Sequence, residues 1–174
     1  FIIILGNNLH TSGRALCVLC FCNLQSPSLS RLLQLFSLHK IFLLSKSKLL
    51  DYICSNRRDG GLPEGRIVEI FGPPSIGKSH IATQIARSTQ QSGGIVVYID
   101  TENATSVENL GMLGVDVSKR FVYVDTHCTE EVLSIAESTI LKAKAMNKDI
   151  PVTIIWDSVA ASSPKAELTG TYEQ

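Results

Sequence analysis

Residues 72–79 read Gly-Pro-Pro-Ser-Ile-Gly-Lys-Ser, and this stretch decides the fold class. It fits the phosphate-binding loop pattern G-x-x-x-x-G-K-[ST]. Glycine at positions 72 and 77 lets the backbone turn tightly and approach a ligand closely, because no side chain stands in the way. The pattern predicts that Lys78 reaches the β- and γ-phosphates of a nucleotide and that the Ser79 hydroxyl coordinates Mg²⁺.

The backbone of the same loop supplies further phosphate contacts. The two prolines lack an N–H, but the five residues after them keep theirs, and these amides converge on an anion if a helix begins near Lys78. We therefore predict that every residue of the loop takes part in nucleotide binding: Gly72, Pro73, Pro74, Ser75, Ile76, Gly77, Lys78 and Ser79.

The flanking segments supply the context that the loop pattern requires. Residues 66–71 (RIVEIF) are apolar at alternate positions, as in a strand, and residues 79–91 place Ile81, Ile85 and Ala86 at helical spacing before the stop signal Gly93-Gly94. Strand, loop and helix in this order favour a nucleotide phosphate site over an ordinary glycine-rich turn.

The remaining body alternates strands with helices. Apolar runs at 95–100, 121–125 and 152–158 predict strands, and a helical segment ends near Met112. A second helix follows Thr129 as its N-cap, with an apolar face expected at Val132, Leu133, Ala136, Ile140 and Leu141. This alternation predicts an α/β fold with a mostly parallel sheet, flanking helices and a ligand at the carboxyl ends of the strands.

Acidic residues stand at two of those predicted strand ends. Asp157 ends the run VTIIWD, where its carboxylate would hold Mg²⁺ beside the loop, the Walker B role, and Ser158 follows within reach of the γ-phosphate. Asp100 and Glu102 lie at and just beyond the end of the 95–100 strand, and we assign the attacking water to Glu102. The alternatives are that Asp157 caps a turn and that Glu102 is a solvated loop acid.

Residues 1–44 differ from the body. They lack acidic residues, and the first fifty residues hold five Lys or Arg, whereas residues 51–174 hold eleven against sixteen Asp or Glu. No apolar run reaches the roughly 18 residues of a membrane span. The composition fits an organelle transit peptide or a non-native leader, so we expect a leader at 1–44 and a body at 45–174. Residues 31–44 suggest a short amphipathic helix, and Cys17-x-x-Cys20 alone is a weak metal signal.

Five motifs in the body resemble one family. GGLPEGRIVEIFGP (60–73), GKS (77–79), YIDTE (98–102), LGVD (113–116) and DSVAASSPKAEL (157–168) closely resemble the bacterial RecA recombinase family, over roughly residues 45–174. The first and last of these motifs separate the chain from generic phosphate-loop kinases. The fold that the resemblance implies is a phosphate-loop NTPase with a RecA-like core.

The resemblance also implies an activity. It implies a DNA-dependent ATPase and recombinase that uses ATP and Mg²⁺, forms a filament on single-stranded DNA and serves recombination and repair of DNA damage in the cytoplasm, or in a mitochondrion or plastid if 1–44 is a transit peptide. By matching position, Lys78 and Ser79 take the phosphate and Mg²⁺ roles, Glu102 the catalytic carboxylate and Asp157 the Walker B acid. The alternatives are a nucleotide-binding module without recombinase activity and a RecA-fold regulatory or helicase ATPase.

The chain departs from the family pattern in three places. Asn109 stands where the family commonly has an aromatic residue that stacks on adenine, which leaves the adenine contact open. The chain stops at Gln174, where the first DNA-binding loop of the family should begin, and an N-terminal oligomerisation helix is not recognisable in residues 1–44. We therefore expect a truncated ATPase core whose DNA-binding loops are absent from this chain.

Overall fold

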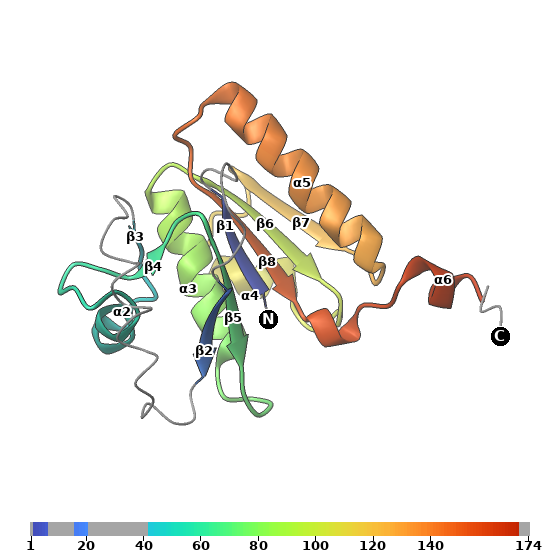
Figure 1. The fold of residues 1–174 in the computed structure, drawn as a ribbon, viewed down its shortest axis with the longest axis horizontal. Helices are drawn as coiled ribbons and strands as arrows, with labels where there is room; N and C mark the ends of the chain where they lie inside the picture. Colours follow the sequence, from blue (N-terminus) through green and yellow to red (C-terminus); the bar gives the residue numbers. More distant parts are fainter. Residues whose placement is uncertain (1, 7–15, 21–41, 171–174) are drawn as a thin grey trace.

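A sheet of parallel strands with one antiparallel member lies at the centre of the structure, a computed structural model that describes residues 2–6, 16–20 and 42–170 (Figure 1). Its strands are β1 (Ile2–Gly6), β2 (Leu16–Cys20), β5 (Arg66–Phe71), β6 (Ile95–Asp100), β7 (Phe121–Asp125) and β8 (Val152–Asp157). The helices are α2 (Lys48–Ser55), α3 (Lys78–Gln91), α4 (Val107–Met112), α5 (Thr129–Met146) and α6 (Lys165–Leu168), with a 3₁₀ turn η1 (Val159–Ala161).

The strand order across the sheet is β2-β5-β1-β8-β6-β7. β6 pairs in parallel with β7 and β8, and β5 pairs in parallel with β2. β1 is antiparallel to both of its neighbours, β5 and β8, and therefore separates the strand before the glycine-rich loop from the strand that ends at Asp157. The α/β class, the mostly parallel sheet and the flanking helices expected from the sequence are confirmed.

Helices cover both faces of the central strands (Figure 1). One core cluster joins Val68, Ile70, Val96, Tyr98 and Ile155 to α3, and the other joins Val97, Ile99, Ile154 and Trp156 to α5. All of β8 is buried, and so is β6 after its first residue. Burial on two faces explains why these strands read as continuous apolar runs rather than as alternating ones.

The predicted elements of the body agree with the structure, but two details of α5 were wrong. Its N-cap is Cys128, not Thr129, and no hydrogen bond from the cap side chain is formed. Leu133 and Leu141 are 52% and 64% exposed instead of belonging to the core. Each follows a buried position by one residue, a rotation of about 100° that turns the side chain away from the sheet. The buried face consists of Val132, Ala136, Ile140 and Ala143.

Part of the predicted leader belongs to the folded structure. β1 and β2 lie within residues 1–44 and pair with strands of the body. The helix expected at 31–44 falls outside the described residues except at its end, where Phe42–Leu43 form the short strand β3 and pair with β4 (Leu62–Pro63). The Cys17-x-x-Cys20 motif lies within β2, and its side chains are outside the described part of the structure.

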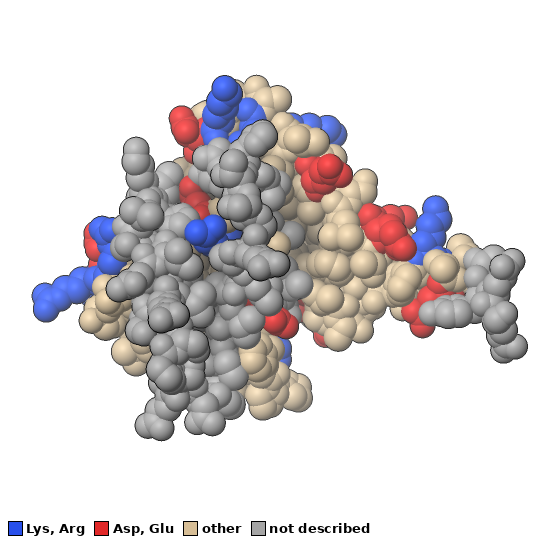
Figure 2. Space-filling model, in the orientation of Figure 1, with Lys and Arg blue, Asp and Glu red and all other residues tan. Residues whose placement is uncertain are grey.

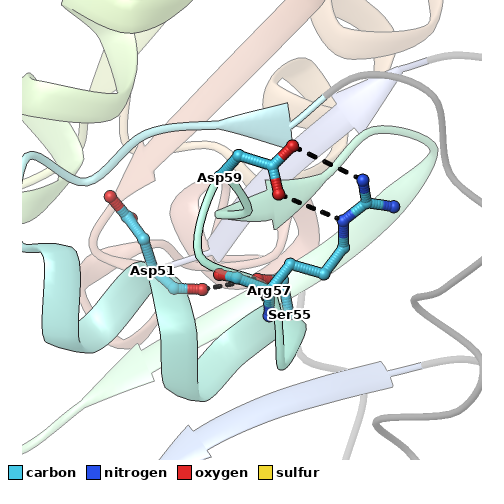
Figure 3. Close-up of polar contacts among 4 residues, drawn as sticks. All are labelled: Asp51, Ser55, Arg57 and Asp59. Atoms are coloured by element: carbon cyan, nitrogen blue, oxygen red, sulfur yellow. Dashed lines mark hydrogen bonds and ion pairs between the residues drawn. The ribbon is translucent and has the colours of Figure 1, made fainter.

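A small unit around α2 precedes β5. Ser55 ends the helix by donating its hydroxyl to the Asp51 carbonyl at 2.7 Å, and Arg57 forms an ion pair with Asp59 at 3.5 Å (Figure 3). The Arg57 guanidinium also lies 5.3 Å from the ring centre of Phe42 in β3. These contacts close the turn that leads into β4 and β5. In the part of the chain that the structure describes, none of the helices is both long and apolar enough to cross a membrane.

Candidate nucleotide-binding site

The loop between β5 and α3 has the conformation that its glycines predict. Gly77 is the N-cap of α3 and has φ +98°, in the left-handed region that favours glycine. A Cβ at this position would meet no atom within 4 Å, so backbone conformation, not space, requires the glycine. No side chain caps the helix start, and the first amides of α3 therefore point at the space beyond the loop.

A cavity of about 590 Å³ lies against this loop. Its wall combines the loop and the start of α3 with the ends of β6 and β8. The lining residues are Ile70, Phe71, Gly72, Pro74, Ser75, Gly77, Lys78, Ser79, Glu102, Ala104, Asp157, Ser158 and Ala160. This volume is within the range of small-molecule and cofactor sites, about 300–1,000 Å³.

Most of the residues predicted for the site meet in this wall, and three do not. Pro73, Ile76 and Asp100 are not among the lining residues. Asn109 also lies outside the wall, exposed on α4. The resemblance predicts an aromatic residue at this position for contact with adenine. Asn109 does not replace that contact, because it does not line the cavity.

Lys78 is held by its own loop. Its ammonium donates hydrogen bonds to the carbonyl oxygens of Gly72 at 3.0 Å and Pro73 at 2.8 Å. Both acceptors are neutral backbone carbonyls of the loop, and Lys78 is also one of the residues that line the cavity. Ser79, one residue further along α3, also lines the cavity.

Asp157 is the most buried carboxylate of the wall, at 4% exposure. The Tyr98 hydroxyl donates a hydrogen bond to its Oδ2 atom at 2.7 Å. Burial raises the pKa of Asp157 to about 6; the Tyr98 hydrogen bond opposes the shift, and the nearby charges of Asp100 and Glu102 add to it. Burial likewise raises the pKa of the Tyr98 hydroxyl, so this group remains a donor.

Glu102 and Ser158 link the ends of β6 and β8. The Ser158 hydroxyl donates to Glu102 Oε1, and the Thr101 hydroxyl donates to the Ser158 carbonyl at 2.5 Å. The Thr101 amide also donates to the Asp157 carbonyl at 2.7 Å. The Asp157–Ser158 peptide bond is cis. The three hydrogen bonds between the ends of β6 and β8 bring the Glu102 carboxylate to the same cavity as Asp157.

Asp100 lies beneath the wall and is fully buried. Its carboxylate accepts the backbone amides of Glu102 at 3.0 Å, Ala104 at 3.4 Å and Thr105 at 2.9 Å, and the Tyr123 hydroxyl at 3.0 Å. Burial and the Asp100 charge raise the pKa of Tyr123 to about 12. The structure thus uses Asp100 to shape the loop that carries Glu102 rather than to reach the cavity.

Sequence reasoning missed Tyr98, which holds Asp157. A signal was present, because a tyrosine in a fully buried strand needs a partner for its hydroxyl. Tyr98 stands two residues before the end of the 95–100 strand, on the face that the strand's last residue shares. The partner could not be named from the sequence, because it depends on which strand lies next to β6.

Comparison with known proteins agrees with this fold. The α/β sheet with a glycine-rich loop before α3 fits a RecA-like core. The chain belongs to the RecA family, since residues 43–174 match the family model described as the RecA N-terminal domain.

Several curated proteins align with part of the chain. "Protein RecA" of Chlamydia trachomatis serovar L2 is 43% identical over 111 residues, which cover 64% of this chain and 30% of the relative. "Protein RecA" of Chlamydia muridarum is 42% identical over 111 residues, 64% of this chain and 29% of the relative. "Protein RecA" of Chlamydia abortus is 43% identical over the same length, 64% and 30%. The aligned region therefore spans less than a third of these relatives.

Proposed function

We propose that the cavity beside residues 72–79 binds ATP together with Mg²⁺ and supports ATP hydrolysis. The observation that carries this proposal is the meeting, in one cavity, of Lys78 and Ser79 from the loop and helix α3 with Glu102 and Asp157 from two strand ends. A phosphate chain requires donors and positive charge, and a Mg²⁺ ion requires oxygen ligands. Both sets of groups face the same space.

The residues of the wall fit these ligands. The start of α3 offers amides without a side-chain cap, and the positive end of the helix dipole favours an anion there. The Ser79 hydroxyl and the Asp157 carboxylate are hard oxygen ligands of the kind that Mg²⁺ takes, usually with several waters retained. When bound, the cation neutralises charge that develops on the phosphate oxygens.

Each remaining residue has a role in the proposal. Lys78 exchanges its two loop carbonyls for phosphate oxygens, which accept stronger, charge-assisted hydrogen bonds. Glu102 orients the attacking water and accepts its proton. Ser158 holds Glu102 through its hydrogen bond to Oε1 and thus sets the direction of that carboxylate.

Membership in the RecA family supports a wider proposal for the whole protein. We infer an ATP-dependent recombinase that acts on single-stranded DNA as a filament, in recombination and repair. On the face shown in Figure 2, Lys and Arg side chains are interspersed with Asp and Glu over the described surface instead of forming a continuous basic stripe. The proposal therefore assigns DNA contact to segments other than those described on this face.

Calorimetric titration of the full chain with ATP in MgCl₂ tests the nucleotide site. We expect Lys78→Ala to weaken binding on the order of a hundredfold, because two charge-assisted contacts to phosphate are lost. Lys142→Ala is the matched control, since this exposed lysine lies on α5, across the sheet from the loop. Equal affinity of wild type and Lys78→Ala would remove the proposed site. ATP turnover that single-stranded DNA does not stimulate would favour a nucleotide-binding module over a recombinase.

A further inference from the structure

Tyr98 and Tyr123 repeat one contact across neighbouring strands. Tyr98 pairs with Ile155 of β8 in register, and its hydroxyl reaches Asp157, two residues further along that strand. Tyr123 of β7 pairs with Tyr98 of β6, and its hydroxyl reaches Asp100, again two residues further along. Each tyrosine thus holds the aspartate that ends the next strand.

The ring of Tyr98 has no freedom to move its hydroxyl. The residue is fully buried, and its ring lies 6.3 Å from the Tyr123 ring with 12° between the planes. Ile155 flanks it on the other strand. A rigid donor at 2.7 Å from Asp157 Oδ2 fixes the carboxylate rotamer, because rotation would break a hydrogen bond in a buried place.

Because of this contact, the two oxygens of the Asp157 carboxylate have different surroundings. Oδ2 is occupied by Tyr98, whereas Oδ1 makes no hydrogen bond to any of the described residues. Asp157 nevertheless forms part of the cavity wall. One carboxylate oxygen is therefore reserved for the tyrosine and one is left for a ligand in the cavity.

We propose that Tyr98 is a positioning residue that restricts Asp157 to one oxygen toward the cation and so favours Mg²⁺ over Ca²⁺. The inference rests on the proposed function, because it assumes a cation beside the nucleotide phosphates. Mg²⁺ demands near-octahedral geometry with short bonds to single oxygens, whereas Ca²⁺ accepts carboxylates through both oxygens and in irregular geometry. A carboxylate held at one oxygen suits the smaller ion.

The test measures ATP binding by the full chain, without turnover, as MgCl₂ or CaCl₂ is added to metal-free protein. The readout is the ratio of the half-saturating Ca²⁺ and Mg²⁺ concentrations. Tyr98→Phe keeps the ring stack and removes only the hydroxyl, and we expect it to lower the preference for Mg²⁺ about tenfold. Tyr123→Phe is the matched control, because it removes the hydroxyl that reaches Asp100 instead of Asp157, and it should keep the wild-type ratio.

The outcomes separate this inference from the proposed function. A wild-type chain that binds no ATP with either ion contradicts the proposed function itself. A wild-type chain that prefers Mg²⁺, together with a Tyr98→Phe variant of the same preference, overturns the positioning role alone. Equal weakening with both ions also overturns it, because a merely structural role leaves the ratio unchanged.

A second variant covers the case in which Tyr98→Phe does not fold. Asp157→Glu moves the carboxylate one methylene past the Tyr98 hydroxyl, so the hydrogen bond to Oδ2 is lost while the acid is kept. It should lower the preference for Mg²⁺ in the same direction. A wild-type ratio in this variant counts against the inference.

Discussion

The hydroxyl groups of Thr89 and Thr153 lie 2.6 Å apart in the buried interface between α3 and β8. The Thr89 hydroxyl also donates to the Ile85 carbonyl at 3.0 Å, so the shared hydrogen between the threonines comes from Thr153. Helix α3 begins at Lys78 and β8 ends at Asp157. This buried bond therefore ties the helix that begins with Lys78 to the strand that ends with Asp157.

Thr89→Val should destabilise the fold more than Thr153→Val. Without Thr89, the buried Thr153 hydroxyl has no acceptor, which costs about 1–3 kcal/mol, whereas without Thr153 the Thr89 hydroxyl still donates to Ile85. The double variant should cost less than the sum of the two. Urea unfolding followed by fluorescence of the buried Trp156 measures all three, and equal losses in the single variants would contradict the assigned donor.

Gly94→Ala should also destabilise the fold, by about 2 kcal/mol, because a small-to-large change here overpacks a tight contact. A Cβ at Gly94 would lie 2.6 Å from the Pro151 carbonyl oxygen and 2.6 Å from Thr89 Cγ2. Gly111→Ala is the contrasting variant, since its Cβ meets nothing within 4 Å and it stands in helix α4. There alanine should stabilise by about 0.5–1 kcal/mol. The same unfolding measurement compares the two variants. An unchanged free energy of unfolding in Gly94→Ala would mean that the backbone before β6 shifts to make room for the methyl group.

Glu102→Gln should preserve ATP binding and slow hydrolysis by about two orders of magnitude or more, because the amide cannot accept the proton of the attacking water. The Ser158 hydroxyl can still donate to the side-chain oxygen, so the geometry is kept. Phosphate release and calorimetric binding, measured on the same preparations, separate the two effects. Glu108→Gln on the exposed side of α4 serves as control. Unchanged turnover would move the catalytic role to another acid.

In the absence of metal ions, the free energy of unfolding should depend on the protonation of Asp157. Its pKa is raised from 3.8 to about 6 in the folded chain, so protonation favours the native state and the free energy of unfolding falls as pH rises through that interval. The loss is on the order of 2 kcal/mol. Urea unfolding in EDTA between pH 4 and pH 7 measures it, and Asp157→Asn should show a shallower dependence. Identical pH profiles would place the titrating group elsewhere.

Much of the fold was predictable because its signals are local. The strands at 66–71, 95–100 and 121–125 and the helix after residue 77 follow from short apolar runs and glycine positions, and the structure confirms them. The position of the loop at the end of a strand follows from the same pattern. Prediction was wrong for the exposed leucines of α5, where apolar residue type was taken as a sign of burial.

For the candidate site, too, some features could be predicted from the sequence and others could not. The chain alone shows which groups the loop and the strand ends carry, because the loop pattern and the apolar runs before Asp100 and Asp157 are local features of the sequence. Three features became visible only in the folded chain: Asp100 is buried, Tyr98 holds Asp157 across 59 residues and Thr89 meets Thr153 across 64. The folded chain also shows that β1 lies between β5 and β8. These contacts depend on strand order and register, which arise from packing over the whole sheet and leave no local pattern in the chain.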